Sequence, residues 1–190
     1  MIKVFVDSDI ILDLLAKREP HYIHAAKLFT LIDQQKIIAY TSPLIFANLH
    51  YILKKITSNS SALKNLRKLK TLINILPVDE RVIEQSLNSE FNDFEDAIQY
   101  FTAVNNGINI LLTRNKVDYK KGKITILNSE EFLKTCNKMR GEPTWDNSGF
   151  RQCSIEYFTD KDIIAMNLLC KKYNLSLTYG SFGVKCEGKV

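Results

Sequence analysis

The 190-residue chain has room for one ordinary domain, or for one domain and a small appendage. Its composition, 45% hydrophobic and 25% charged, is that of a globular protein and excludes a fibrous or disordered chain. No apolar run approaches the roughly 20 residues of a membrane-spanning helix, and the first residues lack the charged leader and cleavage site of a signal peptide. We therefore expect a cytoplasmic protein without a membrane segment.

Short β-branched runs alternate with longer segments of helical spacing over the first 134 residues. The runs lie at Ile2–Val6, Ile37–Thr41, Asn74–Val78, Asn109–Thr113 and Lys123–Leu127. Apolar runs without polar alternation are typical of strands covered on both faces, as in a parallel sheet. The alternation of strands and helices therefore predicts an α/β fold with right-handed crossovers.

Helix-start and helix-stop signals fall between these runs. Ser42-Pro43 combines an N-cap residue with proline at the first helical position. Asn92-Asp93 opens another helix, which Gly107 closes. These signals predict helices as the connections between the strands.

A stretch without acidic residues lies between Asp33 and Asp79. Its basic residues are Lys36, Lys54, Lys55, Lys64, Arg67, Lys68 and Lys70. A stripe of one charge sign attracts phosphate and binds nucleic-acid backbones without reading their sequence. A solvated helix face explains any single lysine as well. Nucleic-acid binding and a solvated surface therefore both stay open as interpretations of this stretch.

The composition changes around Gly141–Gly149, a segment typical of a loop or linker. We therefore predict three parts of the chain. These are an α/β domain over residues 1–134, a linker over 135–149 and a small α+β appendage over 150–190.

The last part contains three predicted elements: a strand near Gln152–Phe158, a helix from Thr159 to about Tyr173, and a strand or hairpin over Leu175–Cys186. All four cysteines lie late in the chain, at Cys136, Cys153, Cys170 and Cys186. None lies in a CxxC pair, which favours interior packing over a structural zinc site. So short an appendage cannot build a stable core alone, and we expect it to dock on the α/β domain or on a second subunit.

Polar residues gather where the predicted strands end. Ligands of open α/β sheets bind beyond the carboxyl ends of the strands. The polar residues expected there are Asp7, Ser8, Asp9, Ser42, Asn48, Asp93, Glu95, Asp96, Arg114, Asn115 and Asp118. Helix capping accounts for some of them taken singly. Carboxylates collected at one edge repel one another, and a hard cation such as Mg²⁺ or Mn²⁺ offsets that repulsion.

Asn48 differs from the others because it interrupts the apolar run Pro43–Leu49 inside a predicted helix. A buried amide needs hydrogen-bond partners. We therefore expect a polar side chain to face Asn48.

Three segments resemble motifs of the PIN-domain family. Val4–Pro20 resembles the opening of these domains, Asp93–Gln99 their D-x-E-D-A segment, and Leu111–Tyr119 their L-[VI]-T-R-[DN]-x-x-D-F segment. Ile124–Leu133 resembles the closing strand and helix, so the likeness covers about residues 1–134. It implies a three-layer α/β/α fold around a central parallel sheet. It also implies a metal-dependent endoribonuclease, often the VapC-like toxin of a bacterial toxin–antitoxin pair.

The resemblance assigns catalytic residues. The first aspartate of the family maps onto Asp7, the helix-borne aspartate onto Asp96, and the second acid of the last motif onto Asp118. The usual glutamate of the third helix maps onto Asn48, and the usual aspartate after Thr-Arg maps onto Asn115. Two of the four usual acids are therefore amides here. These two amides favour an alternative function, that of a catalytically weakened or inactive PIN-like module with an RNA-binding or regulatory role.

The implied reaction is metal-assisted hydrolysis of single-stranded RNA. Asp7, Asp96 and Asp118 would hold Mg²⁺ or Mn²⁺, which lowers the pKa of water and stabilises charge on phosphate. Asn48 and Asn115 would ligate through their carbonyl oxygens, orient the attacking water or contact phosphate.

Ser8 and Arg114 would contact the scissile phosphate or brace the carboxylates. The implied partners are RNA, an antitoxin protein and a second copy of the chain in a homodimer. A CheY-like or other doubly wound domain of unrelated function would share an acidic edge, but it leaves the Thr-Arg-Asn motif unexplained.

Overall fold

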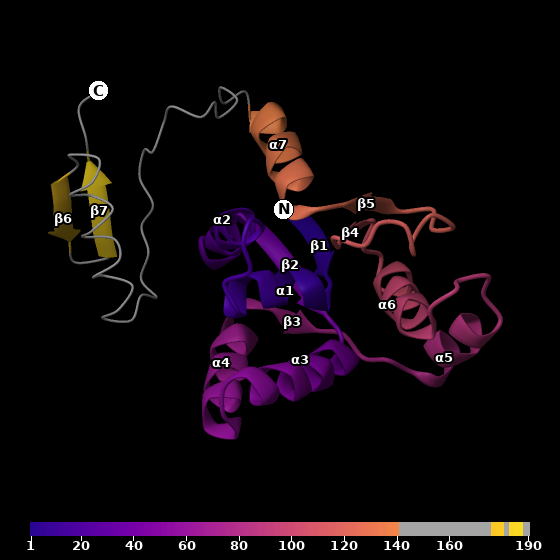
Figure 1. Ribbon diagram of the computed structural model, residues 1–190. Coiled ribbons are helices and arrows are strands. Elements are labelled where there is room, and N and C mark those ends of the chain that lie inside the picture. Colours follow the sequence, from indigo (N-terminus) through magenta and orange to yellow (C-terminus); the bar gives the residue numbers. More distant parts are fainter. Residues whose placement is uncertain (141–175, 181–182, 188–190) are drawn as a thin grey trace. The chain divides into compact units, whose positions relative to one another are not determined.

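The computed structural model describes residues 1–140 and the strand residues 176–180 and 183–187 (Figure 1). The chain divides into two compact units, Met1–Glu142 and Pro143–Val190. No helix within these described residues combines the length and the apolar character needed to cross a membrane.

The first unit is built on a parallel sheet. Its strands are β1 (Ile2–Val6), β2 (Ile37–Thr41), β3 (Asn74–Ile75), β4 (Ile110–Leu112) and β5 (Thr125–Leu127), in the spatial order β3-β2-β1-β4-β5. All five predicted strands are present, and β1 and β2 have their predicted bounds. The predicted α/β fold with a central parallel sheet is confirmed.

Three strands are shorter than predicted, and β4 lacks one predicted residue at each end. β3 ends at Ile75 instead of continuing to residue 78, because Pro77 has no N–H to donate to the ladder. β5 begins at Thr125; the N–H of Lys123 donates instead to the hydroxyl of Tyr100, at 2.8 Å.

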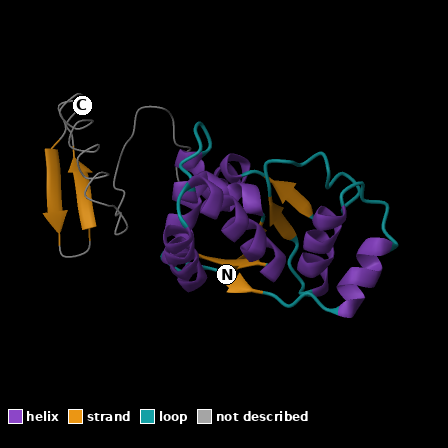
Figure 2. Cartoon of the chain, turned by 60° about the horizontal axis from the view of Figure 1, so that its bottom comes forward, coloured by secondary structure: helices purple, strands orange, loops and turns teal. Residues whose placement is uncertain are grey.

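Helices cover both faces of this sheet. In the described part of the chain they are α1 (Ser8–Leu15), α2 (Tyr22–Asp33), α3 (Pro43–Ile56), α4 (Asn59–Leu72), α5 (Glu80–Leu87), α6 (Phe94–Asn105) and α7 (Ser129–Arg140). The chain steps outward from β1 to β3 and then crosses to β4 and β5. With right-handed crossovers, α1–α4 lie on one face and α5 and α6 on the other. α7 packs on α2, and Figure 2 shows the helices packed around the strands.

The predicted helix signals act as caps. The Ser42 hydroxyl accepts a hydrogen bond from the N–H of Ile45, at 3.2 Å, with Pro43 at the start of α3. Asp93 caps α6. Gly107 follows the end of α6 with φ +69°, a left-handed conformation that glycine adopts without strain.

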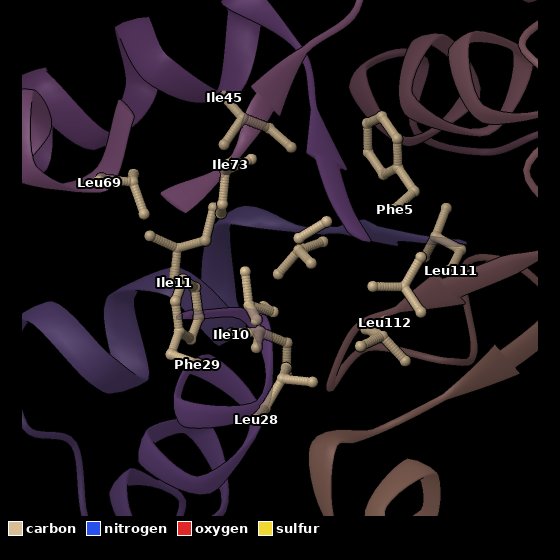
Figure 3. Close-up of a cluster of buried hydrophobic side chains, with 14 of the residues drawn as sticks. Phe5, Ile10, Ile11, Leu28, Phe29, Ile45, Leu69, Ile73, Leu111 and Leu112 are labelled. Carbon is tan, nitrogen blue, oxygen red and sulfur yellow. The ribbon is translucent and has the colours of Figure 1, made fainter. Parts of the chain in front are cut away.

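The core of the first unit fixes the ends of the central strands. Val4, Phe5 and Val6 are consecutive in β1 and are all fully buried, as a strand covered on both faces requires. Figure 3 shows side chains of β1, α1, α2, α3, α4 and β4 packed together beside the sheet. β1 and β4 therefore end at defined places, and the polar residues that follow them are held by a packed scaffold.

The second unit contains an antiparallel hairpin of β6 (Ser176–Gly180) and β7 (Gly183–Glu187). It confirms the strand or hairpin predicted over residues 175–186. The strand predicted near residues 152–158 and the helix predicted from 159 to about 173 lie outside the described residues. The division at residues 135–149 stays a prediction. Cys136 of α7 is buried in the core, in agreement with the packing role predicted for the cysteines.

Candidate active site

The candidate site lies at the carboxyl ends of β1 and β4. These strands are neighbours, and β2 and β3 extend to one side of them while β5 extends to the other. Open α/β sheets bind ligands at such a switch point of the strand order. The backbone N–H of Asp7 donates to the carbonyl of Leu112 at 3.0 Å, so the first acidic residue adjoins the end of β4.

Asp7 ends β1 and caps α1. Its carboxylate accepts a hydrogen bond from the N–H of Ser8, at 2.6 Å, and the residue is 8% exposed. Burial and the nearby carboxylates of Asp9 and Asp96 raise the pKa of Asp7 to about 7. Capping alone explains its position, but not its burial beside two other acids.

Asp96 lies in the first turn of α6. Its N–H donates to Oδ1 of Asp93 at 3.1 Å, and its carboxylate accepts a hydrogen bond from the Tyr119 hydroxyl at 2.9 Å. Burial raises the pKa of Asp96 to about 6; the Tyr119 bond opposes the rise, and the carboxylates of Asp93, Asp118 and Glu95 add to it. Asp96 is thus a neighbour of several acids.

Tyr119 lies beside both Asp7 and Asp96. Burial raises the pKa of its hydroxyl well above the usual range, and the two carboxylates raise it further. The carboxylate of Asp96 is close enough to Asp7 to raise the pKa of Asp7. The carboxylate of Asp118 in turn raises the pKa of Asp96. Of the three acids for which metal binding is predicted, the structure thus places Asp96 near Asp7 and near Asp118.

Asn48 of α3 and Glu95 of α6 form a pair across the site. The Nδ2 atom of Asn48 donates a hydrogen bond to Oε1 of Glu95. Burial raises the pKa of Glu95, and the bond from Asn48 opposes this rise. The polar partner expected for Asn48 is therefore a carboxylate, one position before Asp96.

Asn115 and Asp118 form a second pair, in the loop after β4. The Nδ2 atom of Asn115 donates to Oδ2 of Asp118, and its backbone N–H donates to the Thr113 hydroxyl at 3.0 Å. Asn115 is exposed and Asp118 is half-buried. As in Asn48, the amide nitrogen faces a carboxylate, so the carbonyl oxygen is the atom that remains to accept a bond or to ligate.

Arg114 braces two acids of α1. Its Nη1 atom lies 3.2 Å from Oδ1 of Asp13, and its Nε atom 3.7 Å from Oδ2 of Asp9. Its backbone N–H also donates to Oδ2 of Asp9, at 2.7 Å. Asp13 is 1% exposed, so the ion pair compensates a buried charge. Ser8 contributes its backbone N–H to Asp7.

The donor set fits a hard divalent cation in type. Carboxylate and amide oxygens suit Mg²⁺ and Mn²⁺. The Oδ1 atom of Asp9 is buried, and no group in the described part of the chain donates a hydrogen bond to it. Among the same residues, no three or more His, Cys, Asp or Glu side chains are grouped as a metal site. The site offers buried carboxylates that lie near one another in pairs, and a cation would stabilise their charged forms.

Three residues join the site without a role having been predicted for them. For Glu95 the sequence held one signal, because the amide of Asn48 was expected to need a polar partner. Tyr119 stood in the sequence only as an aromatic residue at the end of the last motif, 23 positions after Asp96. Asp9 followed Asp7 closely enough to be expected at the same edge.

The family model described as PIN domain matches residues 3–117. Ribonuclease VapC1 of Aquifex aeolicus (strain VF5) is 26% identical over 142 residues, which cover 72% of this chain and 97% of that relative.

Solved structures with similar folds include VapBC2 from Rickettsia felis, bound to a DNA fragment from the promoter. It has a TM-score of 0.53 and 16% identity, and the match covers 67% of this chain and 98% of that chain. A toxin–antitoxin complex from Klebsiella pneumoniae has a TM-score of 0.52 and 21% identity, with coverages of 66% and 97%. At these identities the likeness shows a shared fold.

Proposed function

Because the chain belongs to the PIN domain family, we propose that it is a metal-dependent endoribonuclease that hydrolyses phosphodiester bonds of single-stranded RNA. The observation that carries this proposal is the position of Asp96 near both Asp7 and Asp118, beside the switch point of the sheet. The similarity to Ribonuclease VapC1, over 97% of that relative, supports the same reaction.

Asp7, Asp96 and Asp118 would hold the divalent cation, Mg²⁺ or Mn²⁺. When bound, the cation would lower the pKa of water and stabilise the charge that develops on phosphate. Tyr119 would keep the carboxylate of Asp96 oriented through its hydroxyl, and Asn115 would do the same for Asp118. These hydrogen bonds would hold two of the three acids in place before the substrate arrives.

The two amides would present their carbonyl oxygens to the cation, the attacking water or the phosphate, since their nitrogens are directed at carboxylates. Glu95 would supply a carboxylate on the side of the site where Asn48 replaces the glutamate usual in the family. A site with an amide at position 48 thus still has a negative charge there.

Arg114 would act through Asp9 and Asp13, whose charges it balances, and would hold the start of α1 against the loop after β4. Ser8, half-buried next to Asp7, would contact the scissile phosphate through its hydroxyl. Both residues would support the reaction from beside the acids.

A catalytically weakened or inactive RNA-binding module is the second candidate. The amides at Asn48 and Asn115 favour it, since each lowers the negative charge available to a cation. Salt-sensitive RNA binding without cleavage would distinguish this module from the nuclease.

We also propose that the chain is the toxin of a toxin–antitoxin pair, cytoplasmic and bound by an antitoxin protein. The similarity to Ribonuclease VapC1 and the fold shared with a toxin–antitoxin complex from Klebsiella pneumoniae support this role. A homodimer stays a prediction.

RNA cleavage by the purified full chain tests the proposed reaction. We expect cleavage of single-stranded RNA with Mg²⁺ or Mn²⁺, none with EDTA, and none by Asp7→Asn. Glu90→Gln is the matched control, since the Glu90 side chain is 85% exposed and pairs only at the surface with Lys121. Metal-independent cleavage, or full activity in Asp7→Asn, would overturn the mechanism.

A further inference from the structure

One face of α3 leads away from the site. Asn48, Tyr51 and Lys55 are spaced i, i+3 and i+7 and therefore share this face. At about 1.5 Å per residue, Tyr51 lies roughly 4.5 Å and Lys55 roughly 10 Å along the helix from Asn48. Asn48 itself faces Glu95 in the site. The surface formed by Tyr51 and Lys55 on this face therefore adjoins the site.

Tyr51 is an unusual residue for this position. It is 61% exposed, whereas Ile45, Leu49 and Leu53 bury the opposite face of the same helix. The Nζ atom of Lys55 lies 4.0 Å from the centroid of the Tyr51 ring. In the part of the chain that the structure describes, Tyr51 is therefore mostly exposed, with a cation above its ring. The Tyr51 ring offers a flat π-face on which a base can stack, and Lys55 offers a positive charge for a phosphate.

The surrounding charge has one sign. No acidic residue occurs between Asp33 and Asp79, so α3 and α4, which pack together, carry only basic charges. The basic residues of α4 are all exposed: Lys64, Arg67, Lys68 and Lys70. Such a surface attracts a polyanion and retains it without reading its sequence.

We propose that Tyr51 stacks on a base next to the scissile phosphate and that Lys55 binds a neighbouring phosphate of the same single strand. This inference rests on the proposed ribonuclease function and specifies how the substrate is held beyond the reacting bond. Stacking tolerates any base, so this contact gives affinity and strand placement without sequence preference.

Binding of a short fluorescein-labelled single-stranded RNA of mixed sequence, followed by anisotropy in EDTA, tests the proposal. We expect Tyr51→Ala to weaken binding by about fivefold or more, and Tyr51→Phe to retain it because the ring remains. We expect Lys55→Ala to lower the slope of log affinity against log salt by about 0.7, the value for one phosphate contact on a single strand. Lys3→Ala is the charge-matched control, since Lys3 is exposed, lies near the amino end of β1 and is outside the stretch without acidic residues.

The outcomes separate this inference from the proposed function. If wild type binds and cleaves RNA while Tyr51→Ala and Lys55→Ala bind as wild type does, the α3 face belongs to another partner, such as a protein, and the inference is wrong. If wild type neither binds nor cleaves RNA, the proposed function fails and this inference with it. Thermal melting of each variant identifies any loss of affinity that comes from misfolding; both side chains are exposed, so we expect wild-type stability.

Discussion

The hydroxyl of Tyr119 donates a hydrogen bond to Oδ1 of Asp96, at 2.9 Å, and joins the loop after β4 to the first turn of α6. Tyr119 is 1% exposed, so its ring is held by packing and its hydroxyl has a fixed direction. A buried donor of this kind orients the carboxylate it binds and favours its charged form. Tyr119 is therefore a positioning residue for Asp96.

Tyr119→Phe removes that hydroxyl and keeps the ring. We expect RNA cleavage to fall by about 10- to 100-fold, because Asp96 loses its orienting bond. The pKa of Asp96 should rise above its present value of about 6, because the Tyr119 bond now lowers it. The acid limb of the pH–activity profile should therefore move to higher pH.

Tyr100→Phe is the matched control. Tyr100 is also buried, and its hydroxyl accepts a hydrogen bond from the backbone N–H of Lys123, whereas the Tyr119 hydroxyl donates to Asp96. Both variants should lose about 1–2 kcal/mol of stability, but only Tyr119→Phe should change the pH profile. Equal effects of the two variants on cleavage would show that Tyr119 has a structural role alone.

Arg114→Ala tests the bracing of α1. It leaves the buried carboxylate of Asp13 without its ion-pair partner, which we expect to cost about 3–5 kcal/mol of unfolding free energy. Lys116→Ala breaks the more exposed pair with Glu131 and should cost less than about 1 kcal/mol. Denaturant unfolding measures both; similar losses in the two variants would contradict the bracing role of Arg114.

The strands could be predicted closely because their residues carry the signal locally. β1 and β2 are runs of apolar residues covered on both faces, and their bounds agree with the prediction. β3 was predicted too long because the apolar pattern continues past Ile75, whereas the missing N–H of Pro77 ends the pairing.

The site could be predicted only in part. The proximity of Asp7 and Asp96 follows from the edge that parallel strand ends share, and from the family resemblance. The partners of individual side chains do not follow, because they depend on the packing angles of helices far apart in the chain. Glu95 opposite Asn48 is such a case.

Replacing Asn48 by glutamate would place it beside Glu95, where two carboxylates repel. We therefore expect Asn48→Glu alone to lower metal-free stability by about 1–3 kcal/mol. The exchange Asn48→Glu with Glu95→Gln keeps one acid and one amide, and should recover most of that loss. A double-mutant cycle measured by thermal unfolding gives the coupling; additive effects would show that the two side chains do not interact.

Stability of the metal-free protein should fall as pH rises. The folded pKa values of Asp7 and Asp96, about 7 and about 6, exceed their ordinary value of 3.8. The folded protein therefore binds more protons than the unfolded chain between these limits, and the stabilisation present below about pH 4 is lost through pH 6–7. Melting temperatures measured in EDTA at about pH 5 and about pH 8 check the sign.

Asp7→Asn should flatten this pH dependence. Asparagine caps a helix about as well as aspartate does, so α1 keeps its cap while the buried charge disappears. We expect the variant to be more stable than wild type at about pH 8, by on the order of 2–4 kcal/mol without metal. A variant less stable than wild type at that pH would contradict the raised pKa of Asp7.

Binding of Mn²⁺ to the purified full chain, followed by electron paramagnetic resonance at about pH 8, tests most directly whether the acids form one cation site. Wild type should bind Mn²⁺. Asp7→Asn and Asp96→Asn should each weaken that binding by about tenfold or more, because each removes a charged ligand. Glu90→Gln should bind as wild type does. Wild-type affinity in Asp7→Asn, or no Mn²⁺ binding by wild type, would contradict a metal site at the carboxyl ends of β1 and β4.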